Sequence, residues 1–133
     1  MAYDLLKAMR LKETISHQDH HDLESFIWVL HYSILRHLVG LGGVTSRQSV
    51  RDFFIQVFGH MHLRTIMASR YNGLGDFVME IKGDISPPLE KLLGALDMAI
   101  MSSRPRPGAE HSNLTYDVLF TFLDRAIVEM QSL

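Results

Sequence analysis

The chain has 133 residues, about the size of one ordinary domain, and its 47% hydrophobic and 21% charged residues are typical of a globular protein. The absence of cysteine excludes a disulfide framework and a thiolate metal site, and the net charge of −2 gives no basis for binding nucleic acid or an anionic membrane. With no secretory signal pattern and no apolar run of roughly 20 residues, we expect one intracellular domain over residues 1–133, cytoplasmic or nuclear, with no membrane and no nucleic-acid partner.

The strongest helical pattern lies over about residues 22–38. Asp22 is predicted to cap this helix, and Glu24 stands favourably in its first turn. The apolar positions at helical spacing are Leu23, Phe26, Ile27, Leu30, Ile34 and Leu38, and the opposite side carries Trp28, Val29, Tyr32 and Leu35. A helix that is hydrophobic nearly all round usually lies at the centre of its domain, so we predict that this is the core helix.

Two further helices are predicted in the middle of the chain. The first starts at Thr45 or Ser46, and Gly59 follows its end. Its apolar face consists of Val50, Phe53, Phe54, Val57 and Phe58. The second is weaker, carries Leu63, Ile66 and Met67, and is closed by the turn signal at residues 72–73. Residues 74–82 show no clear pattern, and at most one short helical turn is expected there.

The last part of the chain has clear start and stop signals. Ser86 is predicted to cap a helix that has Pro87 at its first position, where a missing N–H costs little. Its apolar face is Leu89, Leu92, Leu93, Leu96 and Ile100. Residues 104–108, Arg-Pro-Arg-Pro-Gly, cannot be helical and are predicted to form a surface loop. Thr115 then caps a final helix, so the whole pattern is all-α, with no window of alternation long enough for a sheet.

Three segments resemble one known family. Residues 22–26, Asp-Leu-Glu-Ser-Phe, resemble the start of the long buried F helix in the C-terminal lobe of fungal-type protein kinases, and casein-kinase-type enzymes carry a similar Asp-Leu-Glu-Ser. Residues 1–6, Met-Ala-Tyr-Asp-Leu-Leu, resemble the end of the activation segment of the same family. Residues 113–117, Asn-Leu-Thr-Tyr-Asp, resemble the start of its last helix. The resemblance implies an all-α C-lobe subdomain that runs from the activation segment to the last helix.

The resemblance also implies structural roles for four residues. Asp22 matches the F-helix aspartate, which in kinases bonds backbone groups of the catalytic loop; without that loop, a plain helix cap is the competing interpretation. Asp4 matches the glutamate of the Ala-Pro-Glu motif, which in kinases pairs with an arginine between the last helices. Arg104 and Arg106 stand in the corresponding loop, and we therefore expect one of them to pair with Asp4.

The catalytic elements of a kinase do not occur in this sequence. Phosphoryl transfer needs a Gly-rich loop, a lysine on the phosphates, a His-Arg-Asp segment and an Asp-Phe-Gly segment. Residues 40–45 have threonine where the third glycine should fall, and Asp76-Phe77 is followed by Val78. Residues 79–82, Met-Glu-Ile-Lys, come after the F helix, the wrong order for the lysine motif. We expect the nucleotide lobe of full-length relatives to precede Met1.

A cluster of histidines just before the core helix raises the question of a metal. His17, Asp19, His20 and His21 lie within five residues, and His17 and His21 are four apart. A zinc site needs about four converging ligands, usually with a paired motif elsewhere, and none is present. A polar segment leading into a capped helix is the favoured interpretation, and no metal is expected.

Two functions from different classes follow from these patterns. The first is a C-lobe fragment of a Ser/Thr kinase, a truncated product or a degenerate copy, without activity alone. ATP and Mg²⁺ are then expected only for full-length relatives, and no cofactor for this chain. The alternative is a helical protein–protein interaction module. Because an F helix without its usual neighbours exposes apolar surface, we expect protein partners or self-association.

Overall fold

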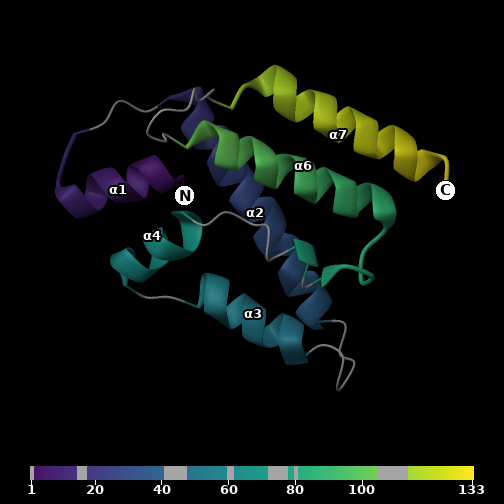
Figure 1. Cartoon of the computed structure of the whole chain (residues 1–133), viewed down its shortest axis with the longest axis horizontal. Coiled ribbons are helices and arrows are strands. Elements are labelled where there is room, and N and C mark those ends of the chain that lie inside the picture. The colour runs from purple at the N-terminus through teal and green to yellow at the C-terminus, as the bar shows by residue number, and fades with distance from the viewer. Residues whose placement is uncertain are drawn as a thin grey trace.

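The computed structural model describes residues 2–14, 18–40, 48–59, 62–71, 78–79, 81–104 and 114–133. Every regular element in these ranges is a helix, so the all-α class is confirmed (Figure 1). The helices are α1 (Tyr3–Leu11), α2 (Asp19–Gly40), α3 (Gln48–Phe58), α4 (Leu63–Tyr71), α6 (Pro87–Ser103) and α7 (Tyr116–Gln131). No helix among the described residues combines the length and the apolar character needed to cross a membrane.

The long helix α2 is the centre of the structure, as the sequence predicts. It contacts α1, α3 and α6, and its buried side chains join one core cluster with those of α6. The α2 members of that cluster are Leu23, Ile27, Trp28, Leu35 and Leu38. Around α2, helices α1, α4 and α3 contact one another in series, and α6 packs lengthwise against α7 (Figure 1).

The predicted start of α2 is wrong by one turn. The helix begins at Asp19 and Asp22 lies exposed in its first turn, not at its cap. The cause is His21, whose Nδ1 accepts a hydrogen bond of 3.1 Å from the backbone N–H of Gln18. A side chain at the third helical position that bonds the N–H of the residue before the helix stabilises an earlier start.

Although α2 is central, one of its sides is exposed to solvent. Phe26 and Val29 are 46% and 59% exposed, and Ser33, Arg36 and His37 continue the exposed side. The buried side runs instead through His21, Glu24, Trp28, His31 and Leu35. Polar groups therefore occupy buried positions on α2, while two of its large apolar side chains are open to solvent.

The predicted starts of α6 and α7 are confirmed. Ser86 and Thr115 have extended backbone angles and occupy the capping positions, and Pro87 begins α6. Only Thr115 forms the capping bond with its side chain, accepting from the N–H of Val118 at 3.3 Å. The apolar faces predicted for α3 and α6 lie in or against the core, which contains Val50, Leu93, Leu96 and Ile100. On α4, Met67 is buried, but the residues predicted for its apolar side are not part of that core cluster. Thr45 and Ser46, residues 72–77 and residues 105–108 lie outside the described part of the chain.

Helix α1 has no counterpart among the predicted helices. It has only nine residues, and Lys12 ends it in the left-handed conformation at φ 54°. So short a helix is marginal in water unless other elements hold it. Leu6 and Ala8 are buried, and α4 packs along α1.

Candidate functional site

The polar centre of the molecule is Glu24, on the buried side of α2. Its carboxylate accepts two hydrogen bonds from the guanidinium of Arg104, which directly follows α6. Nη2 lies 2.7 Å from Oε1, and Nη1 lies 3.0 Å from Oε2. Both side chains are almost completely buried. Two parallel bonds between a guanidinium and a carboxylate form the strongest type of ion pair in proteins, because both charges and directions match.

Glu24 also fixes the start of α1. Its Oε1 accepts from the backbone N–H of Tyr3 at 3.1 Å and from Nε1 of Trp28 at 3.3 Å. Ala2 donates its N–H to Oγ of Ser25 at 2.9 Å. Two consecutive residues at the chain's beginning are thus bonded to two consecutive residues of α2.

Two arginines extend this network into α4 and α3. Arg104 donates from Nη2 to the carbonyl of Arg70 at 3.2 Å, and its guanidinium lies 4.7 Å from the ring centre of Tyr3. Arg70 lies over Trp28 at 4.2 Å and over Phe58 at 4.9 Å. Burial lowers the pKa of Arg70 to about 10, against the opposing effect of the Glu24 charge. Arg70 still remains a cation at neutral pH, held by two aromatic faces.

The predicted pair between Asp4 and Arg104 is not what the structure shows. Arg104 bonds Glu24, and among the described residues Asp4 is within ion-pair distance of His20 and His21 instead. Glu24 pairs with Arg104 in place of Asp4 because it lies on the buried side of α2, facing the end of α6. Arg106 lies outside the described residues, so its pairing stays a prediction. Asp22 is exposed in the first turn of α2.

Asp4, His20 and His21 form the tightest group of potential metal ligands among the described residues. Oδ2 of Asp4 lies 3.9 Å from Nε2 of His20 and 3.8 Å from Nε2 of His21, and the two imidazole rings are 4.1 Å apart. Because Nδ1 of His21 accepts from Gln18, the neutral ring carries its proton on Nε2. That nitrogen then has no lone pair for a metal, so the group fits a contact between α1 and α2 better. His17 lies outside the described residues.

A groove between α1 and α4 lies next to the buried network. It encloses about 330 Å³ and is lined by Tyr3, Arg10, Arg64, Met67, Ala68 and Tyr71. The rings of Tyr3 and Tyr71 are 5.4 Å apart, and the buried Arg104 supports Tyr3. The described residues that line the groove include no carboxylate and combine two exposed arginines with aromatic and apolar side chains. Sequence reasoning missed this site because its two sides are some sixty residues apart in the chain.

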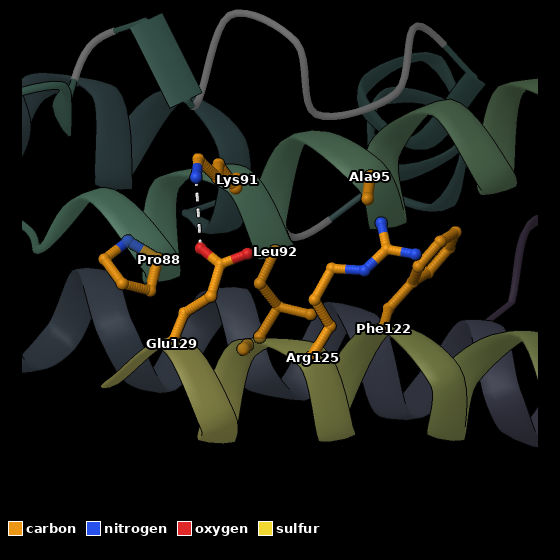
Figure 2. Close-up of a pocket in the computed structure, with 8 residues that line it drawn as sticks. Pro88, Lys91, Leu92, Ala95, Phe122, Arg125 and Glu129 are labelled. Atoms are coloured by element: carbon orange, nitrogen blue, oxygen red, sulfur yellow. Dashed lines mark hydrogen bonds and ion pairs between the residues drawn. The ribbon is translucent and has the colours of Figure 1, made fainter. Parts of the chain in front are cut away.

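A second hollow lies between α6 and α7 (Figure 2). It encloses about 350 Å³, and its lining includes Lys91, Phe122, Arg125 and Glu129. Nζ of Lys91 donates to Oε2 of Glu129 at 3.1 Å, so that carboxylate is already bonded to a cation. Figure 2 shows Arg125 directed toward Phe122 and Ala95. Both side chains of the Lys91–Glu129 ion pair are open to solvent, the lysine more than the glutamate.

No family model, no curated protein and no solved structure matches this chain. A functional assignment therefore depends on its own residues. The Glu24–Arg104 network has a structural role, because both charged side chains are buried and bonded to each other. Among the described residues, the basic groove, the hollow between α6 and α7 and the exposed apolar side chains offer groups to a partner.

Proposed function

We propose that this chain is a kinase-type C-lobe unit that acts as a protein-interaction module and does not transfer phosphate. The single observation that carries the proposal is the buried Glu24–Arg104 pair. It joins the start of the chain, the Asp-Leu-Glu-Ser segment and the residue that follows α6. The resemblance implies a contact between the first and the last of these segments, and here the Asp-Leu-Glu-Ser segment joins them.

The details of the pair agree with this assignment in one respect and modify it in another. In kinases an arginine between the last helices pairs with a carboxylate from the end of the activation segment. Here the arginine is Arg104, between α6 and α7, but the carboxylate is Glu24 of α2. The start of α1 participates through the backbone N–H of Tyr3. The same connection is thus made with a carboxylate from a different helix.

The lack of catalysis follows from the requirements of phosphoryl transfer. Mg²⁺ must be held by acidic groups, and a further aspartate must position the attacking hydroxyl. Glu24 is fully committed to Arg104, Trp28 and Tyr3. The sequence contains neither His-Arg-Asp nor Asp-Phe-Gly. We therefore assign no cofactor to this chain.

A thermal melt with and without excess Mg-ATP tests this assignment. A ligand that binds the folded state raises the transition midpoint by mass action, whereas one that does not bind leaves it unchanged. We expect no shift beyond that of Mg²⁺ alone. A clear rise specific to Mg-ATP would show a nucleotide site and would overturn the non-catalytic assignment.

The exposed apolar surface favours the interaction role. Phe26 and Val29 of α2 and Tyr116, Phe120 and Ile127 of α7 are each between 44% and 59% exposed. Scattered exposed apolar residues are normal, but a regular row on one helix indicates a surface that binds another protein.

A further inference from the structure

Helix α7 carries an apolar row that the described residues cover only in part: four of its five side chains are 37% to 54% exposed, and Leu123 packs against the core. Tyr116, Phe120, Leu123, Ile127 and Met130 follow one another at spacings of four, three, four and three residues. This is the spacing by which one helix packs along another. Tyr116 and Phe120 stack with ring centres 6.0 Å apart, so the row begins with an ordered pair of exposed aromatics. We call these five residues the α7 row.

The charges beside the α7 row select the kind of surface that can cover it. Asp117 and Asp124 are exposed and seven residues apart, which places both on the same edge of the row. Two α7 helices packed antiparallel about a two-fold axis would bring these acidic edges together. Like charges in that position oppose the contact. A surface that binds the α7 row should therefore be basic at its edge and apolar at its centre.

The groove between α1 and α4 is such a surface. Arg10 and Arg64 line it, and Tyr3, Met67 and Tyr71 supply its apolar part. Lys7 is exposed on the same side of α1, between Tyr3 and Arg10 in helical spacing. The acidic residue of α1, Asp4, contacts His20 and His21 and is not part of the lining. The groove is thus basic, although the chain as a whole has a net charge of −2.

We propose that the α7 row of one copy docks against the α1–α4 groove of a second copy. Asp117 and Asp124 then face Arg10 and Arg64, and the stacked pair Tyr116 and Phe120 meets the rings of Tyr3 and Tyr71. The inference rests on the proposed interaction function and names its partner as the same chain. Because the two surfaces differ, the contact is head-to-tail and leaves one free surface of each kind at the ends of every open assembly.

The size of the two surfaces sets the strength of the contact. Four of the five side chains are 37% to 54% exposed, and aromatic side chains bury roughly 150–250 Å² each, so the α7 row offers on the order of 400 Å² of apolar surface. A matching area of the groove gives about 800 Å² in total, below the roughly 1,200–2,000 Å² of stable interfaces. We expect weak association, with a dissociation constant on the order of 100 µM at low salt.

Charge reversal on each surface tests the proposal. Variant G carries Arg10→Glu and Arg64→Glu, and variant H carries Asp117→Lys and Asp124→Lys. Each should lose self-association in sedimentation velocity up to about 500 µM, because like charges then face each other. An equimolar mixture of G and H should regain it, since opposite charges meet again. The control variant, Arg36→Glu with Arg51→Glu, makes the same charge change as G at exposed residues of α2 and α3 and should behave as the unmodified chain.

The outcomes separate this proposal from its competitors. Circular dichroism first confirms that each variant keeps its helices. Self-association that survives in both G and H would place the contact elsewhere, for example on Phe26 and Val29, and would overturn the proposal. Loss in G alone would show that the groove takes an acidic surface other than α7, with the same consequence. An unmodified chain that stays monomeric to about 500 µM also overturns it, but leaves the Mg-ATP result, and hence the non-catalytic assignment, untouched.

Discussion

His31 is a buried imidazole on α2, and its environment fixes its charge. Its Nδ1 lies 2.7 Å from the carbonyl oxygen of Ile27, which can only accept, so that nitrogen carries the proton. Burial lowers the pKa of His31 from 6.5 to about 4, with the Ile27 hydrogen bond acting weakly against it. The ring is therefore neutral in the folded protein over the whole physiological range.

The lowered pKa of His31 predicts a loss of stability in mild acid. The unfolded chain binds a proton below pH 6.5, whereas the folded chain does so only below about pH 4. The contribution of the neutral His31 to the free energy of unfolding is therefore fully present above pH 6.5. It decreases between pH 6.5 and pH 4, and the loss at pH 5 is roughly 2 kcal/mol. Urea unfolding at pH 7.5 and pH 5 should show this difference, and His31→Gln should reduce it. An undiminished difference in the variant would assign the effect to other groups.

At the scale of single helices, the caps of α6 and α7 form a matched pair that differs in one bond. Thr115 Oγ1 accepts from the N–H of Val118, whereas Ser86 makes no such bond. We predict that Thr115→Ala lowers the free energy of unfolding by about 1 kcal/mol and Ser86→Ala by less than half of that. Denaturant titration of both variants measures the difference. Equal losses would contradict the capping role given to Thr115.

The same helices show which parts of the fold can be predicted from sequence. Ser86, Pro87 and Thr115 act on their own helix ends, so local rules locate α6 and α7. The start of α2 depends on His21, a residue outside the usual capping types, and the prediction there is wrong by a turn. Helix α1 exists because α4 and Glu24 hold it, and no local pattern contains that information.

The candidate site could be predicted only in part, for a related reason. Family resemblance names Arg104 and Arg106 as candidate partners of Asp4, but Arg104 forms its buried ion pair with Glu24. Its partner depends on which carboxylate faces the end of α6, and Glu24 and Arg104 are separated by 80 positions in the chain. Spacing cannot determine such a contact. The α1–α4 groove is also formed by residues that are distant in the chain, and for that reason the sequence did not predict it.

At the scale of the whole molecule, one ion pair connects four separate segments of the fold. Glu24 and Arg104 bond the start of α1, the core of α2, the end of α4 and the residue after α6. Removing one member of a buried pair leaves the other charged and without its partner in a low-dielectric interior. The usual loss is about 3–5 kcal/mol, a large part of the stability of a small domain.

The most direct test of this account is the unfolding free energy of Glu24→Gln measured beside that of Asp4→Asn. We predict a loss of about 3–5 kcal/mol for Glu24→Gln, because Arg104 keeps its charge. Asp4 is about one-third exposed and lies 3.8 Å or more from its histidine neighbours, so its substitution should lose less than about 1 kcal/mol. A small loss for Glu24→Gln, or a larger one for Asp4→Asn, would contradict the assignment of Glu24 as the carboxylate that holds the fold together.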